Sequence, residues 1–267
     1  MLLSVIFKIR GSAKSNRLIK MNSSQSILSQ TLVVLPAYNE AEALPTVLAE
    51  LASHVELVNV LVVDDGSSDD TADIAEKFGV DVLRLPFNLG VGGAMRAGFK
   101  YALVEEYKNV VQLDADGQHD PSDISKLVAN LEHADLVIGA RFAGVGEYKV
   151  KGFRAFAMKV LSLTLSKICK QQLTDTTSGF KAIGPRALAL FASNYPAEYL
   201  GDTVEALVIA SRSGCNIVQV PVEMRERIAG VASQSFVKSF VYLVRACLAI
   251  FIALIRPIDE VSPKVSK

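Results

Sequence analysis

Short apolar runs alternate along the chain with stretches in which apolar residues recur at helical spacing. Runs that are apolar throughout predict buried strands, and they lie at 31–36, 58–63, 80–85, 110–113, 135–139 and 216–222. Helical spacing predicts helices over 42–53, 69–78, 92–106, 153–170 and 203–213. Buried strands separated by helices are typical of a mostly parallel, twisted sheet covered on both faces. The pattern therefore predicts an α/β domain over residues 31–230.

The last apolar stretch, at 236–256, differs because Lys238 and Arg245 interrupt it. Steps of 7 and 11 residues place Lys238, Arg245 and Arg256 on nearly one line of a helix. A helix with one basic stripe and a wide apolar face is typical of the membrane interface. We interpret 231–267 as an amphipathic membrane-associated helix with a short tail. The alternatives are a spanning helix, which a central arginine disfavours, and a helix packed on the domain or on a partner subunit.

Charge is distributed unevenly, although 28 basic residues balance 28 acidic residues overall. Residues 1–30 carry a charge of +5 and residues 231–267 a charge of +3, whereas the body between them carries −8. We interpret 1–30 as a flexible basic tail. Basic ends suit an anionic membrane surface. The high mean hydropathy of +0.31 separately indicates contact with lipid. The lack of a basic excess argues against a nucleic-acid-binding protein.

Cysteine usage indicates the compartment. The chain has three cysteines, Cys169, Cys215 and Cys247, with no close spacing between them. An odd number without pairing is neither a disulfide framework nor a zinc site, which favours a reducing compartment.

An acidic motif follows the predicted strand at 110–113. Asp114 and Asp116 are two residues apart, so both side chains point the same way in an extended segment. Two adjacent carboxylates favour a hard divalent cation such as Mg²⁺ or Mn²⁺, and Gln118 adds a neutral oxygen one step further along. The alternative is an acidic turn that caps a helix starting near Pro121.

Polar loops also follow the first two strands, at 36–40 and 64–69. Ligands of open α/β sheets bind beyond the carboxyl ends of the strands. There Tyr38 can stack on a base, and Asp64 or Asp65 can bond a base or ribose. The segment 88–93 is rich in glycine and opens a helix, whose free N–H groups suit phosphate. The alternatives are a helix N-cap at 67–69 and close helix packing at the glycines.

Six motifs occur in order between residues 36 and 181: PAYNE, VVDDGSSDDT, NLGVGGAMRAG, DADGQHDP, GAR and TSGFK. The ordered set resembles inverting glycosyltransferases of family 2 with a GT-A fold, especially dolichyl- and polyprenyl-phosphate mannosyl- and glucosyltransferases. The resemblance implies that Asp114, Asp116 and Gln118 hold the metal. With the loop residues above, the predicted nucleotide-binding set is Pro36, Ala37, Tyr38, Glu40, Val63, Asp64, Asp65, Asn88, Gly90 and Ala115.

The resemblance also implies an acceptor side. Arg141 matches an arginine that such synthases direct at the acceptor phosphate, and Ser178 matches the serine of their SGF motif. Thr174 stands where they commonly carry a second arginine. Arg225 and Arg227 resemble their basic phosphate-binding segment.

The acceptor decides whether a base is needed. A phosphate monoester is already ionised, whereas a sugar hydroxyl must lose its proton to a carboxylate. Asp202 and Glu205 are the candidates for that base, and a helix cap is the alternative role of Asp202.

The leading hypothesis is a metal-dependent, inverting transfer of a sugar from a GDP- or UDP-sugar to a dolichyl- or undecaprenyl-type polyprenyl phosphate. We expect the enzyme at the cytoplasmic face of the membrane. A membrane-protein partner and a second copy of the chain are further candidates for contact with it. The alternatives are transfer to a sugar hydroxyl in cell-surface polysaccharide assembly and a catalytically silent nucleotide-sugar-binding subunit.

Overall fold

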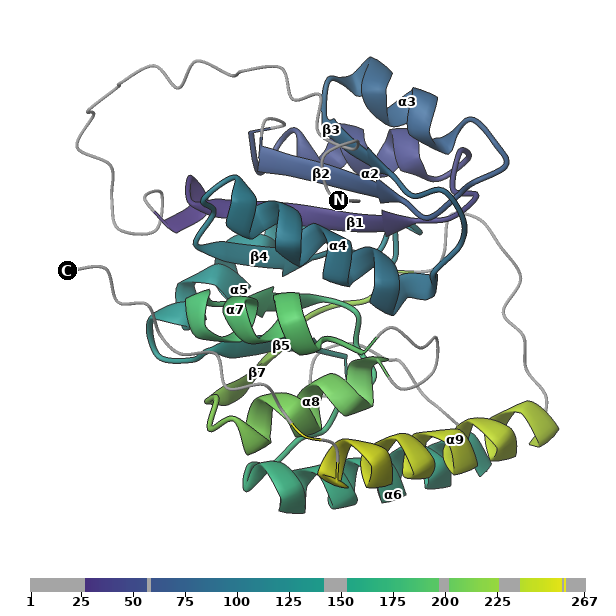
Figure 1. Cartoon of the computed structure of the whole chain (residues 1–267), viewed down its shortest axis with the longest axis vertical. Helices are drawn as coiled ribbons and strands as arrows, with labels where there is room; N and C mark the ends of the chain where they lie inside the picture. The colour runs from purple at the N-terminus through teal and green to yellow at the C-terminus, as the bar shows by residue number, and fades with distance from the viewer. Residues whose placement is uncertain are drawn as a thin grey trace.

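The central sheet grows out of the apolar runs of the sequence. The computed structural model describes residues 27–56, 59–141, 153–196, 202–225, 236–255 and 257 of the chain. Within these residues one seven-stranded sheet carries helices on both faces (Figure 1). Its strands are β1 (Thr31–Ala37), β2 (Val60–Asp64), β3 (Asp81–Arg84), β4 (Asn109–Gln112), β5 (Leu136–Ala140), β6 (Lys181–Ile183) and β7 (Ile217–Pro221).

The strand order is β3-β2-β1-β4-β6-β5-β7. β1 pairs in parallel with β2 and β4, and the parallel pairs β2–β3 and β5–β7 extend the sheet on either side. The predicted strands are confirmed to within a few residues, and so is the mostly parallel arrangement. The carboxyl ends of β1, β2 and β4 consequently meet at one edge.

Helices cover the two faces of the sheet. The helices are α2 (Leu44–Leu51), α3 (Thr71–Phe78), α4 (Gly90–Val104), α5 (Ile124–Ala129), α6 (Phe153–Cys169), α7 (Pro185–Asn194), α8 (Asp202–Arg212) and α9 (Phe236–Ile255), with single 3₁₀ turns at Pro121–Asp123 and Asn130–Glu132. α2, α3 and α5 pack in the core of one face, and α4, α7 and α8 pack in the core of the other. Alternate residues of each strand serve the two cores, which is why the runs are apolar throughout.

β6 and α7 are among the elements that the pattern did not predict, as is α5, which was named only as the helix that the acidic turn could cap. β6 has three residues, too few to show a periodicity, and it runs antiparallel to β4 and β5. α7 follows directly and begins at Pro185, a residue that suits the first turn of a helix. β6 and α7 occupy a stretch that the sequence pattern left as a loop, and β6 joins the two parallel parts of the sheet.

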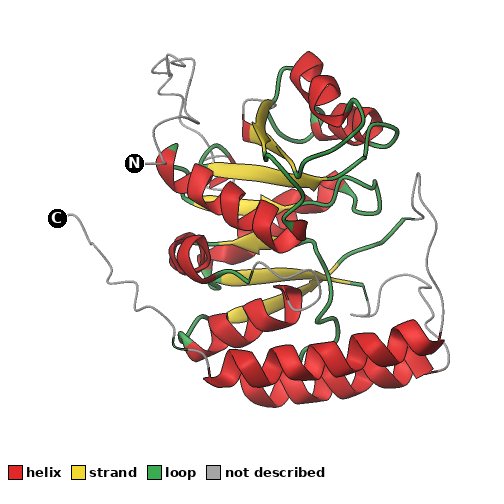
Figure 2. Cartoon of the chain, turned by 45° about the vertical axis from the view of Figure 1, so that its right-hand side comes forward, coloured by secondary structure: helices red, strands yellow, loops and turns green. Residues whose placement is uncertain are grey.

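α9 lies beside α6 and α8 at the β7 end of the molecule (Figures 1 and 2). Ala246, Ile250 and Ala253 form its buried face, and they belong to the same core as α4, α7 and α8. This buried face therefore agrees with one alternative interpretation of the sequence, in which the C-terminal helix packs on the domain. Among the helices described, none combines the length and apolarity needed to cross a bilayer.

The predicted tail at 1–30 lies mostly outside the described residues. The structure describes the chain from Ile27, and Ile27 and Leu28 already pack against the core beneath α2. Thr31 donates a side-chain hydrogen bond to the carbonyl of Ile27, 2.7 Å away.

Gly66, in the loop after β2, allows a test of how closely this loop approaches the segment before α4. Its φ is +74°, and a Cβ there would lie 2.8 Å from the backbone carbon of Phe87. Left-handed backbone costs a residue with a side chain about 1–2 kcal/mol, and the contact with backbone atoms adds to this. We expect Gly66→Ala to lower the free energy of unfolding by about 3 kcal/mol in urea titrations.

Gly79 provides the matched control, because its φ is +80° and nothing lies within 4 Å of its added Cβ. Gly79→Ala should therefore lose only the backbone contribution. Equal losses in the two variants would contradict the close approach of the two loops.

Candidate functional site

A pocket of about 330 Å³ opens at the carboxyl edge of β1, β2 and β4. Its lining includes residues from the loops after these strands, from the start of α4 and from the segment before β6. The predicted residues that line it are Pro36, Ala37, Tyr38, Glu40, Asp65, Asn88, Gly90, Asp114, Ala115 and Asp116. Sequence motifs far apart along the chain thus meet at one place.

Asp65 links the loop after β2 to the start of α4. Its Oδ1 accepts a hydrogen bond from the backbone N–H of Leu89, at 2.8 Å. Burial, together with the nearby charge of Asp64, raises the pKa of the Asp65 carboxyl, although amides of Leu89 and Gly90 oppose the shift. α4 begins at Gly90, whose φ is +78°. Asp65 therefore holds the glycine-rich segment against the pocket.

Two residues of the predicted nucleotide set lie outside the pocket lining. Val63 is fully buried in the core, because its side chain faces α4 rather than the edge. Asp64 is buried at the end of β2, and its Oδ1 accepts a hydrogen bond from the N–H of Ser67 at 3.0 Å. Asp64 therefore stabilises the turn behind the pocket.

The acidic motif forms a tight turn after β4. Asp116 is 7% exposed, and its Oδ1 accepts a hydrogen bond from the N–H of Gln118 at 3.0 Å. Gly117 has a φ of +75°, which permits this turn. Asp114 is more open, and Nε2 of the buried His119 lies 3.4 Å from its Oδ2. The two carboxylates line the same pocket, although Gln118 does not line it.

The donor set at this turn suits a divalent cation in part. The two carboxylates that line the pocket leave positions for phosphate oxygens and water, as is usual for Mg²⁺, whereas Gln118 lies outside the lining. Gly179 lies against Asp114, since a Cβ at Gly179 would come within 2.4 Å of Asp114 Oδ2. No group of three or more His, Cys, Asp and Glu side chains in the described part of the chain is arranged to hold a metal. A cation here would consequently depend on ligand oxygens to complete its shell.

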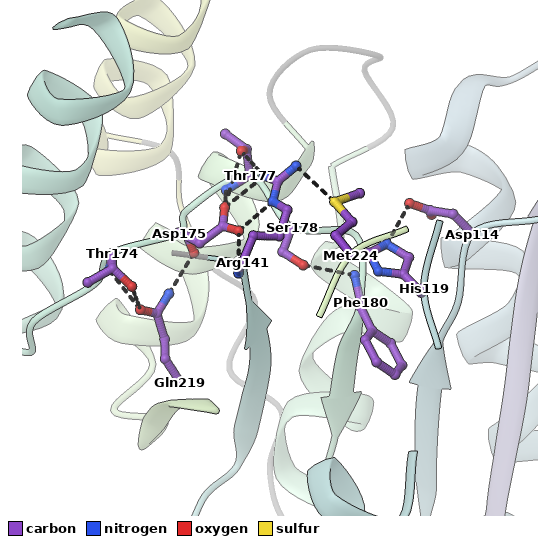
Figure 3. Close-up of polar contacts among 10 residues, drawn as sticks. All are labelled: Asp114, His119, Arg141, Thr174, Asp175, Thr177, Ser178, Phe180, Gln219 and Met224. Atoms are coloured by element: carbon purple, nitrogen blue, oxygen red, sulfur yellow. Dashed lines mark hydrogen bonds and ion pairs between the residues drawn. The ribbon is translucent and has the colours of Figure 1, made fainter. Parts of the chain in front are cut away.

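Arg141 lies at the end of β5 in a buried ion pair with Asp175 (Figure 3). Nε of Arg141 donates to Oδ2 of Asp175 at 2.6 Å, and Nη2 donates to Oδ1 at 2.8 Å. Nη2 also donates to the hydroxyl of Thr177 at 2.7 Å, and Thr177 lines the pocket. The fork of hydrogen bonds fixes the plane of the guanidinium beside the pocket.

Asp175 is fully buried, and its ionisation depends on this pairing. Burial by itself raises the pKa of the carboxyl, but hydrogen bonds and charge from Arg141, with the N–H of Thr177, hold it below its ordinary value. Arg141 therefore faces an ionised carboxylate at neutral pH.

The loop before β6 is also tied to β7. The N–H and hydroxyl of Thr174 both donate to Oε1 of Gln219, and Nε2 of Gln219 donates to the carbonyl of Asp175 at 2.6 Å (Figure 3). Thr174, which stands where an arginine was expected from the resemblance, thus anchors the loop. Ser178 is buried, and its Oγ accepts a hydrogen bond from the N–H of Phe180.

The remaining predicted acceptor residues are dispersed. Arg225 pairs with Asp120 at 2.6 Å and with Glu50 at 2.8 Å. Glu205 is 8% exposed on α8 and does not line the pocket. Asp202 begins α8, but its side chain lies outside the described residues, as does Arg227.

Six residues line the pocket without having been predicted: Val91, Ala94, Gln112, Thr177, Gly179 and Thr203. Gly179 and Thr177 flank Ser178, which was predicted on the acceptor side, so the lining includes neighbours of a predicted residue in the same motif. Asp175 was not predicted either. The sign of it in the sequence is a single acidic residue within a segment rich in Thr and Ser. Gln112 was hidden because it lies within the predicted strand at 110–113, whose other residues are apolar.

Comparison with known proteins bears on this pocket. Residues 32–189 match the family model described as glycosyl transferase family 2, and they contain most of the lining residues. The chain belongs to glycosyltransferase family 2. This glycosyltransferase is 35% identical to an undecaprenyl-phosphate mannosyltransferase of Micrococcus luteus over 77% of the chain and 88% of that relative. It is 31% identical to a polyprenol monophosphomannose synthase of Mycolicibacterium smegmatis over 77% and 81% of the two chains.

A solved structure shares the fold of this family 2 glycosyltransferase. Glucosyl-3-phosphoglycerate synthase of Mycobacterium tuberculosis, in complex with Mn²⁺, uridine diphosphate and phosphoglyceric acid, superposes with a TM-score of 0.65 at 20% identity. The match covers 89% of this chain and 84% of that enzyme. The same enzyme has also been crystallised with Mg²⁺ and uridine diphosphate. The likeness confirms the expected α/β fold.

The Arg141–Asp175 pair predicts a specific dependence of stability on pH. Because the folded pKa of Asp175 is depressed, its contribution is present above the unfolded pKa of about 3.9 and is lost as the pH falls below it. Asp175→Asn leaves Arg141 buried without its counter-charge, so we expect a loss of about 3 kcal/mol at pH 7. The difference from the wild type should shrink at pH 3 in urea titrations.

Asp73→Asn is the matched control, because Asp73 forms an exposed ion pair with Arg84 at 2.6 Å. Exposed pairs contribute little to stability, so this variant should unfold nearly as the wild type does. A gap between wild type and Asp175→Asn that stays constant from pH 7 to pH 3 would refute the role of the charge.

Proposed function

We propose that this glycosyltransferase transfers a sugar, with inversion, from a nucleoside diphosphate sugar to a polyprenyl phosphate. The observation that carries the proposal is the single pocket in which the loops after β1 and β2, the Asp114–Asp116 turn and the Thr177–Gly179 segment meet. The printed activities of its relatives from Micrococcus luteus and Mycolicibacterium smegmatis support the choice of acceptor.

The end of the pocket beside β1 and β2 suits the nucleotide. Tyr38 is 49% exposed, so its ring is open to stack on a base. The Asp65 carboxylate lies beside Asn88 and the start of α4, where hydroxyl and phosphate groups find partners. A GDP-sugar and a UDP-sugar both satisfy this description, and the solved neighbour with uridine diphosphate favours the second.

Asp114, Asp116 and Gln118 would hold Mg²⁺ or Mn²⁺. When bound, the cation offsets the negative charge that develops on the departing nucleoside diphosphate. The turn at Gly117 and the contact between Gly179 and Asp114 keep both carboxylates directed at the pocket. The bound cations of the glucosyl-3-phosphoglycerate synthase structures support this assignment.

The other end of the pocket suits the acceptor. Thr177 lines this end, and Arg141, which is not itself a lining residue, donates to the hydroxyl of Thr177 while Asp175 holds the guanidinium in one plane. Because the pair is neutral overall, Arg141 orients an acceptor phosphate through directed N–H groups more than through net charge. An ionised phosphate oxygen attacks the anomeric carbon without a base, and the bond to the nucleoside diphosphate breaks in the same displacement.

A sugar hydroxyl as acceptor is the second candidate, and it requires a carboxylate base. Glu205 is buried and does not line the pocket, whereas its neighbour Thr203 does. This placement disfavours Glu205 as the base, whereas the side chain of the other candidate, Asp202, lies outside the described residues.

We also propose that α9 holds the enzyme on the cytoplasmic face of the membrane. The face of α9 opposite its buried residues carries large exposed apolar side chains: Leu248, Phe251, Ile252, Leu254 and Ile255. Arg245 is exposed on the same helix, and an apolar face with basic neighbours suits an anionic bilayer. A membrane protein or a second copy of the chain is the alternative occupant of this face.

The central experiment incubates the protein with UDP-glucose, UDP-N-acetylglucosamine and GDP-mannose, each with and without undecaprenyl phosphate and Mn²⁺. We expect a solvent-extractable glycolipid that requires the lipid phosphate and the cation. Asp116→Asn should lower its rate of formation at least about 100-fold, because the charge that holds the cation is lost.

Asp123→Asn is the control for this variant, since Asp123 lies in the next turn of the chain but outside the pocket. It should leave the rate unchanged. Transfer to an oligosaccharide but not to the lipid phosphate would overturn the acceptor assignment, and hydrolysis or binding without any transfer would overturn the activity itself.

The membrane proposal is tested by co-sedimentation with vesicles of phosphatidylglycerol and phosphatidylcholine. Phe251 and Ile255 are 60% and 64% exposed, so changing both to Asp removes apolar contact without disturbing the core. We expect the double variant to bind vesicles at least about 10-fold more weakly than the wild type.

Leu103→Asp with Val104→Asp is the matched control, because these exposed residues lie on α4, away from α9. This control should bind vesicles as the wild type does. Loss of self-association in the α9 variant, with vesicle binding unchanged, would assign the face to a second copy instead.

A further inference from the structure

Gln112 is a polar side chain buried at the end of β4, on a face of the sheet that is mostly apolar. It ends β4 and is paired in register with Val34 of β1 and Lys181 of β6. Side chains alternate along a strand, so Gln112 shares the face of Val110, which packs in the core under α4. Packing alone would be served by a valine or leucine at this position.

One atom of the Gln112 carboxamide, Oε1, has no hydrogen-bond partner among the described residues. The residue is 1% exposed. A buried polar atom without a partner is unfavourable and rare in folded proteins. Gln112 nevertheless lines the pocket, together with Ala94 of α4 and Asp114. The residue that carries this unsatisfied acceptor therefore borders the space that a ligand in the pocket would occupy.

The order of the strands indicates which part of the ligand lies over Gln112. The predicted nucleotide end is built by the loops after β1 and β2, and the acceptor end lies beside Arg141 at the end of β5. β4 lies between them in the sheet, followed by β6. In a displacement reaction the transferred sugar must lie between the leaving nucleotide and the acceptor. With the two ends of the pocket assigned in this way, the sugar would lie over the end of β4.

We propose that Gln112 recognises a hydroxyl group of the transferred sugar and thereby determines which donor sugar the enzyme uses. Its Oε1 accepts a hydrogen bond from that hydroxyl, so a donor that lacks the hydroxyl, or presents it on the other side of the ring, leaves the carboxamide buried and unsatisfied. Sites of this kind discriminate strongly against analogues without the bonding group. The buried Lys181 directly across the strand pair keeps this part of the face polar. This inference rests on the proposed donor site.

The test compares sugar recognition with nucleotide recognition in Gln112→Leu. Binding of UDP-glucose, UDP-N-acetylglucosamine, GDP-mannose and the free diphosphates UDP and GDP is measured by calorimetry in the presence of Mn²⁺. For the donor that the wild type prefers, we expect affinity to fall at least about 10-fold in the variant. Affinity for the matching free diphosphate should stay within about twofold, because that end of the pocket is unchanged.

Thermal unfolding distinguishes this role from a structural one. Leucine removes an unsatisfied polar atom, so Gln112→Leu should unfold at the same temperature as the wild type or higher. Asn109→Leu is the matched control, because Asn109 begins the same strand, away from the pocket, and its amide donates to the hydroxyl of Thr31 at 3.3 Å. That variant should lose stability and keep the wild-type order of donor affinities.

Two results would overturn the inference. One is an unchanged order of donor affinities in Gln112→Leu, and the other is an equal loss of affinity for the donor and its free diphosphate. If the wild type binds nucleotide sugars but transfers none of them to undecaprenyl phosphate, the proposed function fails. The binding comparison still decides the role of Gln112 in that case.

Discussion

The buried ion pair between Arg141 and Asp175 holds the two halves of the site in relation to each other. Asp175 belongs to the loop before β6, and Arg141 ends β5, so their fork of hydrogen bonds fixes that loop at the sheet edge. Once the loop is fixed, Gly179 lies against Asp114 and Thr177 reaches the pocket. An interaction on the acceptor side thus determines the shape around the acidic turn. The burial of Asp175 makes the arrangement depend on the charge of Arg141, because neither partner is tolerated there alone.

The two ends of the pocket are built on different physical grounds. The nucleotide end follows from parallel strands, whose carboxyl ends meet at one edge and whose loops bond to one another through Asp65 and Leu89. The acceptor end depends on β6, the antiparallel strand inserted between β4 and β5. β6 brings the segment with Thr177 and Gly179 back to the edge where β4 ends. Reactants held at the two ends would meet above β4, which is where Asp114 and Gln112 lie.

Much of the fold was predictable because its main elements are long or strongly patterned. Strands β1, β2 and β4 and helices α4 and α9 are readable from apolar runs and helical spacing. β6 was not predictable, since a pairing of three residues is stabilised by its neighbours and leaves no periodic signal. Most of the predicted nucleotide-binding residues line the pocket, but Val63 and Asp64 do not. The alternation of side chains along β2 directs Val63 into the core, and Asp64 accepts a hydrogen bond within the turn that follows β2.

Sequence by itself determined the chemistry available at this site: ordered acidic and glycine-rich motifs, one α/β domain and a basic, apolar C-terminal stretch. Those properties depend on residue types and on near neighbours in the chain, so they can be read locally. Only the tertiary structure decided that Arg141 is paired with Asp175, that Arg225 is paired with Glu50 and Asp120, and that Gln112 lines the pocket with an Oε1 that no described residue bonds. Each of these facts depends on atoms brought together from strands and loops far apart in the sequence, where burial and pairing set the energy of a charge or an amide.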